Sequence, residues 1–161
     1  MKFIKNVIGS RHFGSKVDIT DPGYNKDVWC RMDDVEIVPG EYTCVIWVQK
    51  EKLNLDGKKL DVLNVGNVGI YLGGVVHAQK SMKEIGTIGV DSGLAGFFEK
   101  KPDYSDKEWD DFCDMIEDRR VPAWTIENGF FSESGYGDGE YPVYAHKTQD
   151  GRITALEIRF I

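Results

Sequence analysis

Tight turns containing glycine divide this chain into short segments, and they constrain its fold more than any other feature of the sequence. The 161 residues include 18 glycines, more than the roughly 7% share that glycine has in average proteins. Several stand in turn-forming pairs, namely Pro22-Gly23, Pro39-Gly40, Asp56-Gly57, Ser92-Gly93 and Asp150-Gly151. In such pairs proline presets φ and glycine adopts positive φ without steric cost. The pattern favours short strands joined by turns over long helices.

Residues 41–50, EYTCVIWVQK, carry the clearest strand pattern between these turns. Tyr42, Cys44 and Ile46 alternate with residues of the other face, and that face is apolar too because it contains Val45 and Trp47. A strand with two apolar faces is typical of the centre of a sheet that is covered on both sides. Further short strands are expected over residues 1–8, 16–20, 59–63, 68–72, 75–79, 87–91 and 94–98, with a polar connection over 11–15. Strands over 141–147 and 152–161 form a predicted C-terminal hairpin around Asp150-Gly151.

One substantial helix is predicted near residues 105–118. Ser105 followed by Glu108 forms a capping box, and apolar residues then recur at the spacing of one helical face: Trp109, Phe112, Cys113 and Ile116. The opposite face is acidic, with Asp106, Asp110, Asp111, Asp114 and Glu117. The expected fold is therefore a β-rich α+β domain of mostly antiparallel sheets, arranged like a sandwich or a barrel, with this helix packed on it.

Nothing in the composition divides residues 1–161 into two domains. No Pro-, Ser- or Gly-rich spacer interrupts the chain, and 41% hydrophobic residues suffice for one core. No apolar run reaches the length of a signal peptide or a membrane span, which predicts a soluble cytoplasmic protein without membrane contacts. Cys30, Cys44 and Cys113 include no CxxC pair, so we expect reduced thiols in or near the core rather than disulfides or zinc ligands.

The net charge of −7 argues against nucleic-acid binding, which needs a basic surface. An acidic surface suits a basic protein partner, although the same charge also serves solubility. Asp110, Asp111 and Asp114 on the predicted helix are the candidate partner surface.

The segment SESGYGDGEYPVY, residues 132–144, is the most unusual stretch of the sequence. In a functional interpretation, its glycines bring backbone N–H groups close to a ligand, with Asp138 and Tyr136 beside it. In a structural interpretation, favoured here, it is a tight turn in which Asp138 accepts hydrogen bonds from neighbouring amides. The segment matches neither a phosphate-binding loop nor a dinucleotide-binding fingerprint.

Asp91 and Ser92 form the second candidate, at the end of an apolar strand in GVDSG. The Gly-x-Ser-x-Gly pattern of serine hydrolases is absent, and the three histidines, His12, His77 and His146, fit no catalytic motif. Trp124 is the tryptophan we single out as a candidate ligand contact, the others being assigned to packing. No catalytic residue, metal site or cofactor is predicted, although Asp21, Asp91 and Asp138 remain three turn aspartates that the fold can bring together.

Four stretches in order along the chain carry a family resemblance: DITDPGY, VPGEY, GVDSGLAGFF and SGYGDGEYPVY. Over residues 17–161 the sequence resembles the bacterial family called domain of unknown function 4241. The resemblance implies a bacterial or phage source and a β-rich fold. That family has no established activity, so the resemblance assigns no catalytic role to Asp91, Ser92 or Asp138.

Three functional hypotheses remain open. The first is a non-catalytic binding or inhibitory protein, such as an immunity or counter-defence factor, whose acidic surface engages a basic partner. The second is a small enzyme or ligand-binding protein with a site around the turns 91–93 and 137–139. The third is a structural or assembly subunit that pairs through exposed sheet edges. The sequence does not define the oligomeric state.

Overall fold

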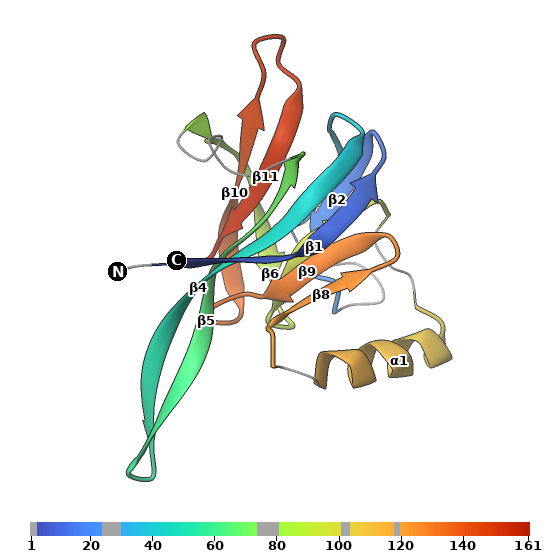
Figure 1. The fold of residues 1–161 in the computed structure, drawn as a ribbon. Helices are drawn as coiled ribbons and strands as arrows, with labels where there is room; N and C mark the ends of the chain where they lie inside the picture. Colours follow the sequence, from blue (N-terminus) through green and yellow to red (C-terminus); the bar gives the residue numbers. More distant parts are fainter. Residues whose placement is uncertain (1–2, 24–29, 74–80, 101–103, 118–119) are drawn as a thin grey trace.

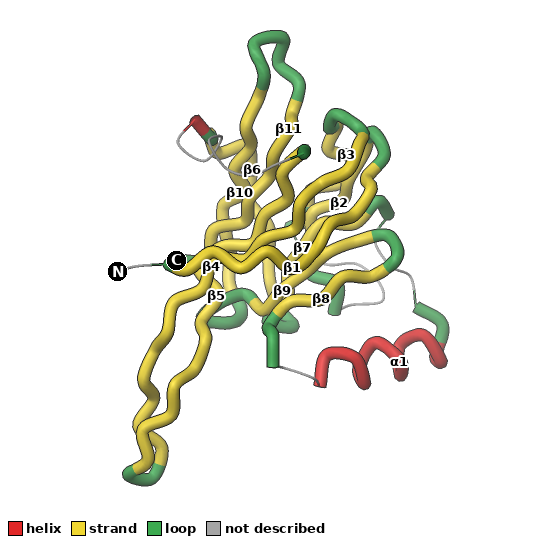
Figure 2. Tube along the Cα trace, in the orientation of Figure 1, coloured by secondary structure: helices red, strands yellow, loops and turns green. Residues whose placement is uncertain are grey.

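The computed structural model describes residues 3–23, 30–73, 81–100, 104–117 and 120–161. Their strands form two sheets in which every pairing is antiparallel (Figures 1 and 2). The first sheet runs in the order β1 (Ile4–Phe13), β4 (Gly40–Leu55), β5 (Lys58–Leu72), β11 (Ile153–Arg159), β10 (Gly139–Lys147) and β6 (Lys83–Val90). The second runs in the order β3 (Met32–Glu36), β2 (Lys16–Thr20), β7 (Leu94–Phe98), β9 (Gly129–Glu133) and β8 (Ala123–Ile126).

This arrangement confirms the predicted β-rich α+β class. The six-stranded sheet ends at β1 and β6 and the five-stranded sheet at β3 and β8, so neither closes into a barrel. Within the described residues, α1 (Asp106–Glu117) is the one α-helix. Among the described residues, no helix is both long enough and apolar enough to cross a lipid bilayer.

The main core lies between the two sheets. It includes Ile46, Ile70 and Leu156 from the first sheet and Phe97 and Phe130 from the second, all with no exposed surface. Because side chains alternate along a strand, the outer face of each sheet then needs its own cover. A second cluster of Val45, Tyr71, Met82 and Ala155 lies on the outer face of the first sheet, with Trp47 and Tyr144 packed against it. Strand β4 is therefore central and apolar on both faces, as predicted.

Strands β4 and β5 continue beyond the sheet as a two-stranded arm (Figure 1). Its turn is Asp56-Gly57, with φ of 52° and 79°, which is the double positive φ expected for this hairpin signal. Leu55 and Leu60 near its tip are 56% and 47% exposed.

Helix α1 covers the outer face of the five-stranded sheet. The Ser105 hydroxyl accepts a hydrogen bond from the Glu108 backbone N–H at 3.3 Å, which confirms Ser105 as the N-cap of the helix, and it donates to the Glu108 carboxylate at 2.9 Å. Phe112 is buried and its ring centroid lies 5.6 Å from that of Phe131. The helix ends at Glu117, and Asp118 and Arg119 lie outside the described residues.

The structure departs from two of the sequence-based expectations, and a third falls outside the described residues. The predicted polar connection over residues 11–15 is wrong, because β1 pairs with β4 as far as Phe13, whose side chain is fully buried. The expectation of core thiols is wrong for Cys30, which is exposed, whereas Cys44 is buried. The predicted strand over 75–79, together with His77, lies outside the described residues.

Candidate functional sites

Asp21 organises the turn that contains Asp91 and Ser92. Its side chain is fully buried at the end of β2, and its carboxylate accepts hydrogen bonds from the backbone N–H groups of Gly23 (2.7 Å), Asp91 (2.8 Å) and Ser92 (2.7 Å). The Ser92 hydroxyl donates to the same carboxylate. Four donors therefore hold this carboxylate in place, and we interpret Asp21 as a clamp that joins the end of β2 to the β6–β7 turn.

The turn at 91–93 lies beside the glycine-rich turn at 137–139. Gly139 of β10 pairs with Val90 of β6, and the Ser134 N–H donates to the Gly93 carbonyl at 2.9 Å. Asp91, Ser92 and Asp138 are all exposed. The two turns that the sequence analysis combined in one hypothetical site are thus neighbours in the fold.

The glycine-rich turn is held by its own side chains. The Gly137 carbonyl accepts hydrogen bonds from the hydroxyls of Ser134 and Tyr141, both at 2.7 Å. Gly135 and Gly137 have φ of 67° and 103°, a region that strongly favours glycine. Ser134 and Tyr141 supply the anchoring that the structural interpretation assigned to Asp138.

The side chains of Tyr136 and Trp124 do not contribute to the candidate site at the turns 91–93 and 137–139. Tyr136 is 65% exposed, and its hydroxyl donates at 3.2 Å to Glu51 at the start of the arm. Hydrogen bonds from Gln49, Asn64 and Tyr136 lower the pKa of Glu51. Trp124 is 8% exposed and stacks on Phe131 with ring centroids 5.3 Å apart, which is a packing role.

These turns contain no recognisable catalytic set. Of the two described histidines, His12 pairs with Glu41 on β4, and the Nδ1 atom of His146 lies 2.7 Å from the Ser81 hydroxyl. Ser92 is bonded to Asp21, a carboxylate that already accepts three backbone N–H groups. Among the residues that the structure describes, no three His, Cys, Asp or Glu side chains are placed to hold a metal ion, so Asp21, Asp91 and Asp138 do not form such a group.

The outward face of α1 presents the predicted acidic surface. Asp110, Asp111 and Asp114 are all exposed. Asp111 and Glu108 also border a hollow of about 240 Å³, whose other lining residues are Tyr104, Phe112, Met115 and Ile126. Burial raises the pKa of Tyr104, and the charges of Asp21, Cys113 and Glu108 act in the same direction, so this phenol stays neutral. The hollow is thus apolar with an acidic rim.

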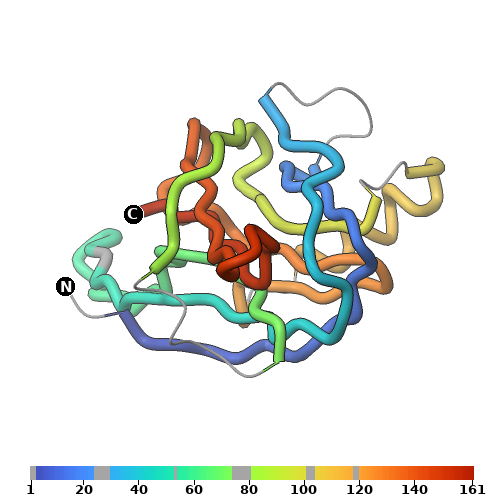
Figure 3. The backbone as a smooth tube through the Cα atoms, turned by 90° about the horizontal axis from the view of Figure 1, so that it is seen from above, coloured from blue at the N-terminus to red at the C-terminus, as the bar shows by residue number. Residues whose placement is uncertain are grey.

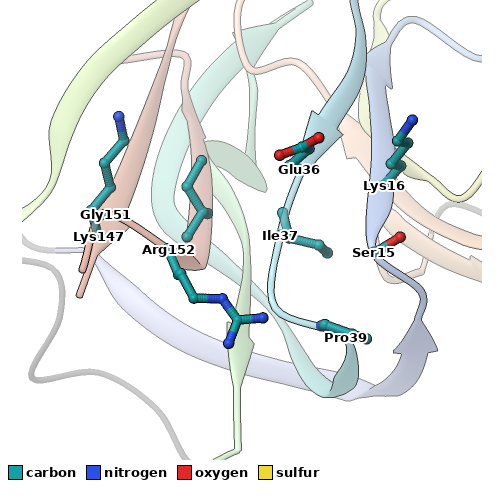
Figure 4. Close-up of a pocket in the computed structure, with 9 residues that line it drawn as sticks. Ser15, Lys16, Glu36, Ile37, Pro39, Lys147, Gly151 and Arg152 are labelled. Atoms are coloured by element: carbon teal, nitrogen blue, oxygen red, sulfur yellow. The ribbon is translucent and has the colours of Figure 1, made fainter. Parts of the chain in front are cut away.

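A cleft of about 600 Å³ lies near the tip of the β10–β11 hairpin (Figure 4). Its polar lining includes three cations, Lys16, Lys147 and Arg152, and the carboxylate of Glu36. Ile37, Pro39 and Ile153 add apolar surface. The cleft could not be predicted from the sequence, because its residues come from three segments far apart in the chain and no spacing rule connects them.

A buried carboxylate on the outer face of the six-stranded sheet was also missed. Glu157 is fully buried and accepts hydrogen bonds from the Tyr71 hydroxyl at 2.5 Å and from Arg159 Nε at 3.1 Å. The Arg159 guanidinium in turn lies 3.8 Å from the centre of the Tyr144 ring. The alternation of Leu156 and Ile158 places Glu157 away from the main core, but it gives no sign that a second cluster buries this face.

Comparisons with known protein families, with curated proteins and with solved structures found no match for this chain. The resemblance to domain of unknown function 4241 stays a prediction.

Proposed function

We propose that this chain is a non-catalytic binding protein that engages a basic protein partner through α1, as an inhibitor of the immunity or counter-defence type would. The observation that carries the proposal is the apolar hollow that Glu108 and Asp111 border on α1, a helix whose exposed surface also carries Asp110 and Asp114. The family resemblance adds a bacterial or phage setting, and we place the protein in the cytoplasm.

The position of the carboxylates supports a role in binding rather than in helix stability. Acidic side chains stabilise the first turn of a helix and destabilise the last, because the helix dipole is positive at its N-terminus and negative at its C-terminus. Asp114 and Glu117 lie toward the C-terminal end of α1, and the last turn of this helix contains no basic residue. This charge arrangement opposes the dipole, so stability does not account for it.

The hollow gives such a surface a point of attachment. Protein interfaces gain most of their affinity from a few side chains that fill pockets, whereas surrounding charges steer association and select partners. A Lys or Arg side chain places its aliphatic stem on apolar surface and its charge at a polar rim. The floor of Tyr104, Phe112 and Met115 below Glu108 and Asp111 fits such a side chain.

The experiment compares two triple variants that each remove three negative charges. One carries Asp110→Asn, Asp111→Asn and Asp114→Asn, and the control carries Asp61→Asn, Glu84→Gln and Glu140→Gln on exposed strand positions. Proteins captured from bacterial lysate at low salt are identified, purified and titrated against wild type and both variants. We expect the helix variant to bind the partner about tenfold or more weakly, with the control close to wild type. Equal affinities of the two variants, or an affinity that does not respond to salt, would contradict the proposal.

The adjacency of the two turns favours a second candidate function, ligand binding around residues 91–93 and 137–139. Asp91, Ser92 and Asp138 are exposed on neighbouring turns that share the bond from Ser134 to Gly93. Titration of ¹⁵N-labelled protein with glucose tests it, because exposed carboxylates and backbone N–H groups both form hydrogen bonds with hydroxyl groups. Amide shifts confined to these turns and lost in the Asp91→Asn, Asp138→Asn variant are expected, whereas unchanged spectra would count against a site for a polyhydroxy ligand.

A further inference from the structure

The cleft at the β10–β11 hairpin gathers positive charge on a chain whose net charge is −7. Within the described part of the chain, Lys16, Lys147 and Arg152 form no ion pair. Glu36, the carboxylate of the lining, is the cross-strand partner of Lys16 in the β2–β3 register, but no ion pair joins the two side chains. The lining therefore contains three cationic side chains and one carboxylate, and its balance of charge is positive.

Arg152 points into the cleft. Figure 4 shows its side chain extending from the hairpin toward the Pro39 wall, with Lys147 and Lys16 on opposite sides. Burial raises the pKa of Tyr42 to about 12, and the Arg152 charge partly opposes this rise. The Tyr42 hydroxyl donates to the Val38 carbonyl at 2.6 Å, which places it next to the segment that contains Pro39. Because the Arg152 charge acts on Tyr42, the guanidinium lies near this segment too.

The carboxylate nearest to Arg152 along the hairpin already has a partner. Asp150 accepts a hydrogen bond from the Thr148 hydroxyl, and this bond is the main reason that the pKa of Asp150 is lowered, with Arg152 a smaller cause. Arg152 thus keeps its guanidinium donors available to a ligand.

Backbone hydrogen bonds fix both walls. The Val38 N–H donates to the Ile153 carbonyl and the Ile37 N–H to the Ser15 carbonyl, both at 2.9 Å. Figures 1 and 3 show the β10–β11 turn beside the segment that joins β3 to β4. A cleft held in this way needs little ordering when a ligand binds, which favours affinity.

The size and lining define the ligand chemistry. Small-molecule sites are typically about 300–1,000 Å³ and combine apolar walls with a few polar groups. The cleft is about 600 Å³, and Ile37 and Ile153 are 5% and 8% exposed. Arginine binds phosphate in a bidentate fork, lysine adds a point charge, and a phosphate monoester carries about −1.5 to −2 charges at pH 7.

We propose that this cleft binds a small phosphate monoester with an apolar or aromatic body, with the phosphate on Arg152 and the body against Ile37, Pro39 and Ile153. Lys147 and Lys16 lie on either side of the cleft, where their charges attract an anion without contacting the same phosphate. The site is separate from the acidic face of α1 and does not depend on the function proposed for that face.

Phenyl phosphate, inorganic phosphate and a phosphotyrosine peptide serve as probes, titrated by calorimetry and followed by amide shifts in ¹⁵N-labelled protein. Phenyl phosphate should bind more tightly than inorganic phosphate and should shift amides of residues 37 and 147–153. The Arg152→Gln variant should weaken phenyl phosphate binding by about tenfold or more, whereas Lys59→Gln on the exposed arm should leave it unchanged.

Three results would overturn the proposal. They are the absence of phenyl phosphate binding at millimolar concentration, equal affinities of the Arg152→Gln and Lys59→Gln variants, and tighter binding of the phosphotyrosine peptide than of phenyl phosphate. The last would assign the cleft to a protein ligand instead. Thermal unfolding of both variants checks that they are folded, since each replaced side chain is exposed.

Discussion

Helix α1 and the tip of the β10–β11 hairpin lie at opposite ends of the molecule (Figure 1). The exposed face of the helix is acidic, whereas the cleft at the hairpin is lined by three cations and one carboxylate. The helix face is built from one continuous segment, Asp106–Glu117, whereas the cleft combines residues from three segments that only the sheets bring together. A net charge of −7 for the whole chain therefore does not describe either surface, because the two differ in the sign of their charge. We propose that one binds a basic protein and the other a small anion.

The largest expected effect comes from removing the anchor of the helix. Phe112→Ala deletes a ring that is 5% exposed and packs on Phe131, and we expect a loss of about 3–5 kcal/mol in the free energy of unfolding. Urea titration measures this loss, and Lys107→Ala on the exposed side of the same helix is the control, expected within about 0.5 kcal/mol of wild type. Phenyl phosphate binding should survive in the folded fraction. An unchanged stability would mean that α1 is not packed as described.

The Asp21 clamp should give the next largest effect. Asp21→Asn replaces one acceptor oxygen by an amino group that faces N–H donors, and we expect a loss of about 2–4 kcal/mol from the free energy of unfolding. Ser92→Ala removes only the hydroxyl and should cost about 1 kcal/mol. If Asp21→Asn costs no more than Ser92→Ala, the carboxylate is not the clamp.

High pH should lower the free energy of unfolding through two buried groups of β4, the Tyr42 hydroxyl and the Cys44 thiol. Burial raises the pKa of Tyr42 from 10.0 to about 12 and that of Cys44 from 9.0 to about 12. The folded state therefore keeps protons that the unfolded chain releases, so this stability is complete below pH 9 and is lost as the pH rises toward 12. Urea midpoints between pH 8 and 11 measure the decline, which should be smaller in Cys44→Ala. An identical decline in that variant would exclude Cys44 as a cause.

The smallest expected effect separates binding from stability on the helix. Asp114→Asn and Glu117→Gln relieve charges that oppose the helix dipole and should raise the free energy of unfolding by a few tenths of a kcal/mol. Asp106→Asn, in the first turn, should lower it by a similar amount. Thermal unfolding at low salt detects the difference in sign. If substitutions at the two ends of α1 change the free energy of unfolding in the same direction, the helix dipole does not account for their effects.

Local patterns in the sequence predicted the fold well. Ser105 and Glu108 set the start of α1, Asp56-Gly57 set the β4–β5 turn, and alternation marked β4 as a central strand. Each of these signals lies within a few neighbouring residues, where capping, positive φ and side-chain period act directly.

The sites were predicted less completely, because they depend on contacts between distant segments. The sequence placed Asp91 and Asp138 in turns but did not show that Asp21 clamps Ser92. It also did not bring Arg152 close to Pro39, since β10, β11 and the β3–β4 connection meet only through tertiary pairing. The net charge of −7 also gave no sign of the cleft, because a sum over the whole chain does not show where a few cations gather.

The most direct test of two separate binding surfaces records amide spectra of one ¹⁵N-labelled sample with two probes, a decalysine peptide and phenyl phosphate. We expect decalysine to shift amides of residues 106–117 and phenyl phosphate to shift amides of residues 147–153, and we expect neither probe to displace the other. Overlapping shifts, competition between the probes, or decalysine shifts scattered over the whole surface would contradict the conclusion that this molecule has two separate binding surfaces of opposite charge.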